Sequence, residues 1–232
     1  MATLLNRGKL DRDLAEIRDA MLRMGARVGR MTEKVVTALM THDLALAGEV
    51  RAEEKEIDAL RYEIEEKCIE TLAMQAPLAG DLRSIISATH IAVELERMAD
   101  YNNGIAKIII RTGDASPVAW MPDFRSMQIQ VCAMLRAAQD AYLKRDLAAL
   151  HAVLDMDDAV DARYKEIQRQ LFDVMAARPG SVARAHSLLW CAHNLERMGD
   201  RVTNVCERAV FTLSGALHEP KPPKKNAKTP DR

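Results

Sequence analysis

Two copies of one acidic segment stand a hundred residues apart in this 232-residue chain. Leu-Glu-Arg-Met-Ala-Asp spans residues 95–100, and Leu-Glu-Arg-Met-Gly-Asp spans residues 195–200. Helical residues four apart lie one above the other, so each copy presents a Glu and an Asp carboxylate side by side. Two like charges in that position repel each other, and a cation is the simplest partner that would favour them. The repeated segment also indicates a tandem duplication.

A second acidic pair precedes each copy. Asp-Leu-Ala opens a candidate helix at residues 43–45 and again at residues 146–148, and the same spacing leads onward to a further pair of carboxylates four residues apart. Consecutive helices joined by a short turn lie antiparallel and adjacent, so four carboxylates in each half can converge. The predicted metal ligands are therefore Glu54, Asp58, Glu96 and Asp100 in the first half, and Asp157, Asp161, Glu196 and Asp200 in the second.

The acidic stripes border the apolar stripes of the same helices on a helical wheel drawn at about 100° per residue. This arrangement predicts carboxylates at the rim of a helical bundle, partly desolvated, in the groove between helices. Ligand sets made only of oxygen favour hard cations, so iron, Mn²⁺ or Mg²⁺ is the expected metal. For any single pair, a solvated charged face is the plainer interpretation.

Three residues next to these carboxylates could also bind a ligand or form ion pairs. His193 lies three residues before Glu196 on the same side of its helix and can join a site, although its counterpart in the first half is Val93. Arg97 and Arg197 directly follow the Glu of each copy. We interpret them as ion-pair partners that hold the carboxylates in place, with phosphate binding as the alternative.

Composition predicts an all-α protein. Hydrophobic residues make up 48% of the chain but aromatic residues only 4%, so aliphatic side chains and thirteen Met must fill the core, as in helix-on-helix packing. A formal net charge of −1 gives no electrostatic case for nucleic acid. The four cysteines show no metal-binding or redox spacing. Without a signal peptide or a membrane-spanning apolar run, we expect a cytoplasmic protein that does not insert into the membrane.

Hydrophobic periodicity and helix-breaking residues predict six helices in two repeats. Asp43 and Asp81 are candidate N-caps, and Asp123 and Asp146 open the first two helices of the second repeat. The first three-helix repeat is assigned to residues 8–113, a linker to 114–122, the second repeat to 123–217 and a disordered tail to 218–232. The helices are expected near residues 10–41, 43–75, 81–113, 123–145, 146–178 and 181–217.

Three longer segments together resemble the PhoU family of phosphate-signalling proteins. They are Gln-Ala-Pro-Leu-Ala-Gly-Asp-Leu-Arg at 75–83, the acidic segment at 95–100 with Ile-Ala at 105–106, and the run from Asp200 to Gly215. The resemblance covers about residues 8–216. It implies two three-helix repeats related by a pseudo-two-fold axis, with E(D)-x-x-x-D motifs that hold metal in some members and map onto the eight acidic residues above.

The resemblance also implies a function. The family acts between the ATPase subunit of a high-affinity phosphate ABC transporter and a sensor histidine kinase, and it represses phosphate-starvation genes when phosphate is plentiful. We therefore expect a regulatory adaptor, a homodimer, recruited to the inner face of the membrane through its partners. The family often has Asn four residues after the motif Asp, as at Asn204, whereas this chain has Gly104 in the first half.

Two alternatives remain open. One is an accessory regulator of a low-affinity phosphate permease, a role of more distant relatives. The other is a di-iron carboxylate oxidoreductase, but that architecture needs Glu-x-x-His pairs, and the chain has only the reversed order at residues 193–196. No nucleophile–base pair, glycine-rich phosphate loop or cofactor motif is recognised in the sequence, so we expect no catalytic residues and no enzymatic activity.

Overall fold

Six long helices make up the part of the chain that the structure describes. The computed structural model describes residues 2–113 and 118–216. The predicted all-α fold is confirmed: within these residues the chain is helical throughout, with short connections and no strand. The helices are α1 (Ala2–Thr41), α2 (Leu44–Gln75), α3 (Ala79–Thr112), α4 (Phe124–Lys144), α5 (Leu147–Ala177) and α6 (Val182–Ser214), with a short 3₁₀ turn, η1 (Pro179–Ser181), before α6.

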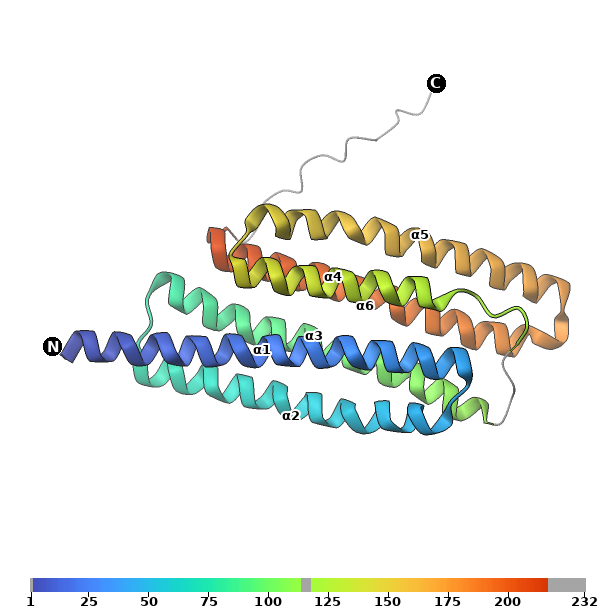
Figure 1. Cartoon of the computed structure of the whole chain (residues 1–232), viewed down its shortest axis with the longest axis horizontal. Helices are drawn as coiled ribbons and strands as arrows, with labels where there is room; N and C mark the ends of the chain where they lie inside the picture. The colour runs from blue at the N-terminus through green and yellow to red at the C-terminus, as the bar shows by residue number, and fades with distance from the viewer. Residues whose placement is uncertain (1, 114–117, 217–232) are drawn as a thin grey trace, which may run out of the picture.

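The helices form two three-helix bundles that lie side by side with their long axes roughly parallel (Figure 1). Helices α1, α2 and α3 make the first bundle, and α4, α5 and α6 make the second. Between the bundles α1 packs against α4 and α3 against α6, while α2 and α5 lie at the outer edges. Because α3 and α6 run in opposite directions, the two repeats are related by a pseudo-two-fold axis.

Helix boundaries follow the capping residues in most places. The side chains of Asp43, Asp123 and Asp146 each accept a hydrogen bond from a backbone N–H three residues ahead, at 2.9–3.1 Å, which satisfies a free donor in the first helical turn. At its C-terminus, α6 ends on Gly215, whose φ of 80° is the left-handed conformation that glycine adopts without strain.

The predicted cap of α3 is wrong. This helix begins at Ala79, after Leu78, so Asp81 lies inside its first turn and caps nothing. The Asp81 carboxylate instead accepts a hydrogen bond of 2.6 Å from Arg7 of α1. The first helix also begins earlier than predicted, at Ala2, and the sixth ends earlier, at Ser214. Residues 114–117 of the predicted linker and the predicted tail, 218–232, lie outside the described residues.

One continuous apolar core joins all six helices. Side chains from every helix, including Met24 and Met31 of α1, are fully buried in it, as expected for a core filled by aliphatic side chains and Met. All four cysteines are buried and free, as expected for thiols that act as small apolar side chains. Burial raises the pKa of the Cys68, Cys191 and Cys206 thiols to about 12.

Polar contacts set the register of α3 against α6. The Glu94 carboxylate accepts hydrogen bonds from Arg201 at 3.1 Å and from Asn204 at 3.0 Å. At the pseudo-symmetric position, the Asn194 side chain donates to a backbone carbonyl of α3 at 3.4 Å, and a Cβ at Gly104 would lie only 2.9 Å from its amide nitrogen. Gly104 thus replaces the expected asparagine because Asn194 fills the space that its side chain would need.

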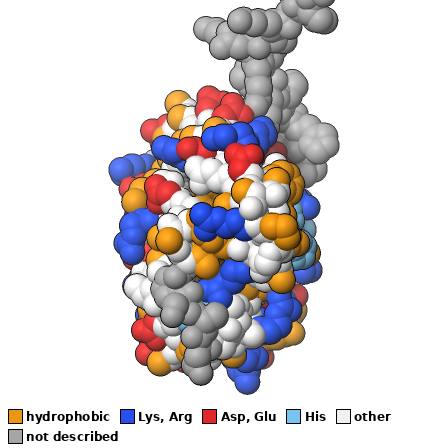
Figure 2. Space-filling view, turned by 90° about the vertical axis from the view of Figure 1, so that its right-hand side faces the viewer, with side chains coloured by type: hydrophobic (Ala, Val, Ile, Leu, Met, Phe, Trp, Pro, Cys, Tyr) orange, Lys and Arg blue, Asp and Glu red, His pale blue; other side chains and the backbone are white. Residues whose placement is uncertain are grey.

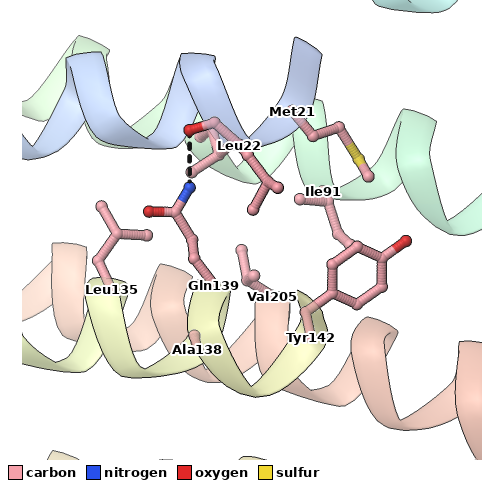
Figure 3. Close-up of a pocket in the computed structure, with 9 residues that line it drawn as sticks. Met21, Leu22, Ile91, Leu135, Ala138, Gln139, Tyr142 and Val205 are labelled. Atoms are coloured by element: carbon pink, nitrogen blue, oxygen red, sulfur yellow. Dashed lines mark hydrogen bonds between the residues drawn. The ribbon is translucent and has the colours of Figure 1, made fainter. Parts of the chain in front are cut away.

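The contact between α1 and α4 depends on a second glycine. The Gln139 side chain of α4 donates a hydrogen bond of 2.9 Å to the Leu22 carbonyl of α1 (Figure 3). A Cβ at Gly25 would overlap the Gln139 amide nitrogen and lie 2.9 Å from its Cδ. One turn later, a Cβ at Gly29 would meet only Leu135 Cδ2 at 3.9 Å, which is an ordinary van der Waals contact.

These two glycines give a matched test of the packing between the repeats. We expect Gly25→Ala to lower the free energy of unfolding by about 1–2 kcal/mol, because overpacking outweighs the gain in helix propensity. Gly29→Ala should be neutral or stabilising by up to about 1 kcal/mol. Chemical denaturation of both variants measures the difference. The double variant Gly25→Ala/Gln139→Ala should recover stability; failure to recover would place the strain elsewhere.

Candidate metal sites

The first four predicted ligands lie along the groove between α2 and α3. Glu54, Asp58 and Glu96 are half-buried, as expected for the rim of the bundle, whereas Asp100 is exposed. Burial raises the pKa of Glu96, and the nearby charges of Asp100 and Asp58 raise it further. Asp58 on α2 therefore faces Glu96 on α3, so the structure brings carboxylates of both helices to one groove.

The other four predicted ligands lie between α5 and α6, and all four are half-buried. Burial is again the largest cause that raises the pKa of Glu196, followed by the charge of Asp200 on the same helix. Asp161 and Asp157 of α5 raise it as well. Both carboxylates of α5 thus act on the Glu of α6, and the predicted convergence of the two pairs is more complete in this groove.

Of the two motif arginines, Arg197 forms a close ion pair with a carboxylate, whereas Arg97 lies only near one. Arg197 donates a hydrogen bond of 2.8 Å to Asp200. The Arg97 Nε lies 3.9 Å from the Glu96 carboxylate. In each groove the arginine opposes the rise in the Glu pKa, since a nearby positive charge favours the ionised carboxylate.

His193 lies against the second site. Its Nδ1 is 3.4 Å from Glu196 Oε2, and its ring contacts Tyr164 of α5 and Trp190 of α6, with centroids 6.1 and 5.7 Å away. Burial and the charge of Arg197 lower the pKa of His193, which favours the neutral imidazole with a free lone pair. Tyr164 and Trp190 are not predicted from the acidic motifs, and the signal that points to them is their difference from the counterpart residues of the other repeat.

The two motif copies differ at one position, where the second copy has Gly199. A Cβ at Gly199 would lie 3.1 Å from Asp157 Oδ1 and 3.4 Å from Val160 Cγ1 of α5. The first repeat has Ala99 at the same place in its motif, together with Glu54 where the second repeat has Asp157. The shorter Asp side chain approaches α6 closely, and glycine leaves the room for that approach.

The carboxylates fit a cation in charge and chemistry but are not preassembled around one. Within residues 2–113 and 118–216, no three His, Cys, Asp or Glu side chains are arranged so that they could hold a metal ion together. Glu196 Oε2 is buried and accepts no hydrogen bond, and the polar atom beside it is His193 Nδ1 at 3.4 Å. Metal binding therefore requires these side chains to rotate toward one ion, and the predicted sites stay a prediction.

Two hollows among the described residues offer no better site. A cavity of about 20 Å³ between α1, α3, α4 and α6 has room for about one water molecule (Figure 3). A hollow of about 220 Å³ has Asp11 and Asp81 beside Arg18 and Arg145, so its charges balance. At the end of the molecule where α1 turns into α2, Lys and Arg side chains lie around the centre of the face (Figure 2). Carboxylates converge instead in the grooves along the helices.

Comparison with known proteins agrees with this fold. A family model described as the PhoU domain matches residues 21–109 and again residues 124–209, one match in each repeat. A relative from Pseudomonas putida, a phosphate-specific transport system accessory protein PhoU homolog, is 34% identical over 205 residues, which cover 88% of this chain and 80% of the relative. A homolog of the same description from Zymomonas mobilis is 35% identical over 206 residues, covering 88% and 86%.

Two solved structures share the architecture. The crystal structure of PhoU from Pseudomonas aeruginosa superposes with a TM-score of 0.82 at 31% identity, covering 89% of this chain and 99% of that one. The crystal structure of the phosphate transport system regulatory protein PhoU from Streptococcus pneumoniae also gives a TM-score of 0.82, at 25% identity, covering 90% and 99%. No described helix combines the length and the apolar character that crossing a bilayer requires.

The crowded carboxylates should destabilise the metal-free protein. A Glu whose folded-state pKa is raised holds its proton longer when folded, so stability falls as the pH rises above the unfolded pKa of about 4.5. At neutral pH, Glu196→Gln should therefore raise the melting temperature, by about 1–2 °C if one close like-charge contact is relieved. Thermal unfolding with a chelator present measures this shift.

A matched control for this substitution lies on α5. Glu166 is more exposed than Glu196 and accepts a hydrogen bond of 2.8 Å from Arg163, so Glu166→Gln should leave the melting temperature unchanged or slightly lower it. If Glu196→Gln lowered the melting temperature as much as or more than the control, repulsion in the groove would not limit stability.

Proposed function

The chain belongs to the PhoU family, and we propose that it is a regulatory adaptor that couples a high-affinity phosphate ABC transporter to a sensor histidine kinase. In this role it represses phosphate-starvation genes when phosphate is plentiful. The chain is a PhoU-type accessory protein of phosphate transport, as the relatives and structures that match along nearly its whole length indicate. The observation that carries the proposal is that the PhoU domain matches the chain twice, once in each repeat.

The shape of the molecule supports docking rather than chemistry on phosphate. Six long helices around one core make a rigid body with two outer grooves, and none of the hollows described above holds a phosphate-sized, positively charged pocket. Its relatives are named as accessory or regulatory proteins. We infer that the chain works by binding partners, the transporter's ATPase subunit and the kinase, and that these partners bring it to the membrane.

Metal binding belongs to this proposal. The α2/α3 groove would hold an ion through Glu54, Asp58, Glu96 and Asp100, and the α5/α6 groove through Asp157, Asp161, Glu196 and Asp200. A bound divalent or ferric ion would neutralise the like charges that now face one another. It would thereby stabilise the folded state and change the charge of the surface offered to partners.

Removing charge from both motifs should reduce the metal content. Asp100→Asn/Asp200→Asn keeps the side-chain shape, so elemental analysis of the purified protein should find less iron, manganese or magnesium than in the unchanged chain. Because the core packs without metal, the helical circular dichroism should survive chelation, with a lower melting temperature. Unchanged metal content in the double variant would show that the ligands lie elsewhere.

Deletion of the gene tests the regulatory role. We expect a deletion strain to express phosphate-starvation genes in phosphate-rich medium, because the repressing link between transporter and kinase is lost. A pull-down from membrane extracts should recover the ATPase subunit, the kinase or both. If the genes stayed silent and neither protein were recovered, regulation of a low-affinity phosphate permease would become the better account, and loss of that permease's control would then be measured.

A further inference from the structure

The outer side of the first repeat carries a strip of exposed apolar side chains. Tyr62 and Ile69 of α2 are 61% and 60% exposed, and Ile86 and Val93 of α3 are 39% and 36% exposed. We propose that this strip, the α2/α3 seam, docks one amphipathic helix of a partner protein, with Lys or Arg along the flank of that helix that faces α2. The inference deepens the proposed adaptor role and rests on it for the existence of a partner.

The four side chains of the seam lie together because of the register between α2 and α3. Asp58 of α2 acts on Glu96 of α3, so these two residues lie level across the two antiparallel helices. Tyr62 comes four residues after Asp58, and Val93 comes three residues before Glu96, so both lie one turn further along the same interhelical face.

The next pair follows at the same interval in both helices. Ile69 comes seven residues after Tyr62, and Ile86 comes seven residues before Val93. Seven residues are about two helical turns, so each helix repeats its apolar side chain on the same face. The seam is therefore a two-sided apolar strip with the repeat of a helix-packing surface.

The second repeat does not have this strip. The α5 positions that match the seam lie 103 residues later than those of α2, as Asp161 follows Asp58, and the α6 positions lie 100 residues later than those of α3. Three of the four positions are polar or charged there: Lys165, His186 and His193. The fourth is Phe172. The fold of the repeat thus does not require an apolar seam, and contiguous exposed apolar strips mark interaction sites.

The α2 edge of the seam is acidic. Of the glutamates from 63 to 70, only Glu65 forms an ion pair within residues 2–113 and 118–216, with Arg61 at 2.9 Å. The other three, all exposed, are Glu63, Glu66 and Glu70. Glu66 comes four residues after Tyr62 and three before Ile69, so it borders both apolar side chains.

The same edge of the second repeat is neutralised by its own ion pairs. At the matching positions of α5, Glu166 pairs with Arg163 at 2.8 Å, and Arg169 pairs with Asp173 at 3.4 Å. The three glutamates of α2 have no such cations beside them. They favour a partner that brings Lys or Arg to this edge, because complementary charge selects a partner and fixes its orientation.

The dimensions of the seam favour a single helix over a second copy of the chain. The strip is one apolar side chain wide on each helix and, from Leu82 to Val93 of α3, about 16 Å long. A standard interface between subunits uses about 20–30 residues on each side. An amphipathic helix instead presents one narrow apolar stripe, which matches this strip in width and repeat.

Tyr62 is the expected anchor of the contact. The guanidinium group of Arg61 lies 3.9 Å from the centroid of its ring, so the exposed ring is supported on one face before any partner arrives. Tyrosine is among the side chains that contribute most to binding, and a supported ring loses less freedom when it is covered.

Fluorescence anisotropy with two labelled synthetic peptides tests the proposal on the full-length protein. Both peptides are amphipathic helices of about 20 residues with Leu at every third and fourth position, and they differ in carrying Lys or Glu along the flank. We expect the Lys peptide to bind at least about tenfold more tightly than the Glu peptide, with a difference that shrinks in high salt. Equal binding of the two peptides would overturn the proposal.

Matched variants locate the binding. Ile69→Glu should weaken binding of the Lys peptide about tenfold or more, because it places a charge in the apolar contact. Phe172→Glu makes the same change at the matching, equally exposed position of the second repeat and should leave binding unchanged. Glu63→Lys/Glu66→Lys/Glu70→Lys should reverse the preference toward the Glu peptide. Circular dichroism confirms that each variant is folded, and equal losses in Ile69→Glu and Phe172→Glu would contradict the assignment to this seam.

Sedimentation velocity of the unchanged chain and of Ile69→Glu tests the second copy as occupant. Dissociation of a dimer by Ile69→Glu, but not by Phe172→Glu, would assign the seam to a contact between two copies and overturn the docking of a partner helix. An oligomeric state that is the same in all three proteins supports it.

Expression of starvation genes separates this proposal from the adaptor role. At equal protein levels, Ile69→Glu should express these genes in phosphate-rich medium as the deletion strain does, whereas Phe172→Glu should keep them silent. If the deletion strain expressed them and Ile69→Glu did not, the seam would be wrong and the adaptor role would stand. If the deletion strain kept them silent while the Lys peptide bound the seam, the adaptor role would fail and the docking surface would stand.

Discussion

The packing of α3 against α6 is the contact on which the rest of the structure depends. Each of these helices carries one copy of the acidic motif, and each also closes the core of its own repeat. Their register is set by Glu94, which binds Arg201 and Asn204, and by Asn194, which reaches the backbone of α3 beside Gly104. Because these partners are directional, the two helices cannot slide without leaving half-buried polar groups unpaired.

This rigid centre allows the molecule to hold charges that repel. The carboxylates of each groove lie at the edge of the core, where burial and their neighbours both oppose ionisation of Glu96 and Glu196. An isolated helix would gain nothing from such pairs, and the stability that tolerates them comes from the apolar side chains packed beneath. Sites that work against stability in this way are where function is usually found.

The two repeats differ by pairs of residues that face each other across a groove. Where the first repeat has Glu54 and Ala99, the second has Asp157 and Gly199, and the loss of a methylene on one helix is matched by the loss of a methyl group on the other. The replacement of Arg61 by Tyr164 goes together with the replacement of Val93 by His193, whose ring Tyr164 contacts. The first pair changes how closely the two helices approach, and the second changes the charge and the polar atoms that line the groove.

Sequence by itself determined the helices, their order and the family. Apolar periodicity and capping residues are local signals, so the capped starts of α2, α4 and α5 could be predicted, and the repeated motif placed the acidic stripes at the rim of the core. Asp81 misled the prediction of where α3 starts, because an Asp can stand either at the N-cap or in the first turn of a helix. Only the hydrogen bond from Arg7 on another helix distinguishes the two positions.

Tertiary structure decided what lies across each groove and between the repeats. Sequence spacing fixes which side chains share one helix face, but the distance between two helices depends on the smallest residues at their contact, such as Gly25, Gly104 and Gly199. It also decided that Tyr164 of α5 stands against His193 of α6, and that Glu196 Oε2 is left buried without a donor. These features depend on how the faces of two helices pack against each other, and the residue periodicity along either helix does not determine that packing.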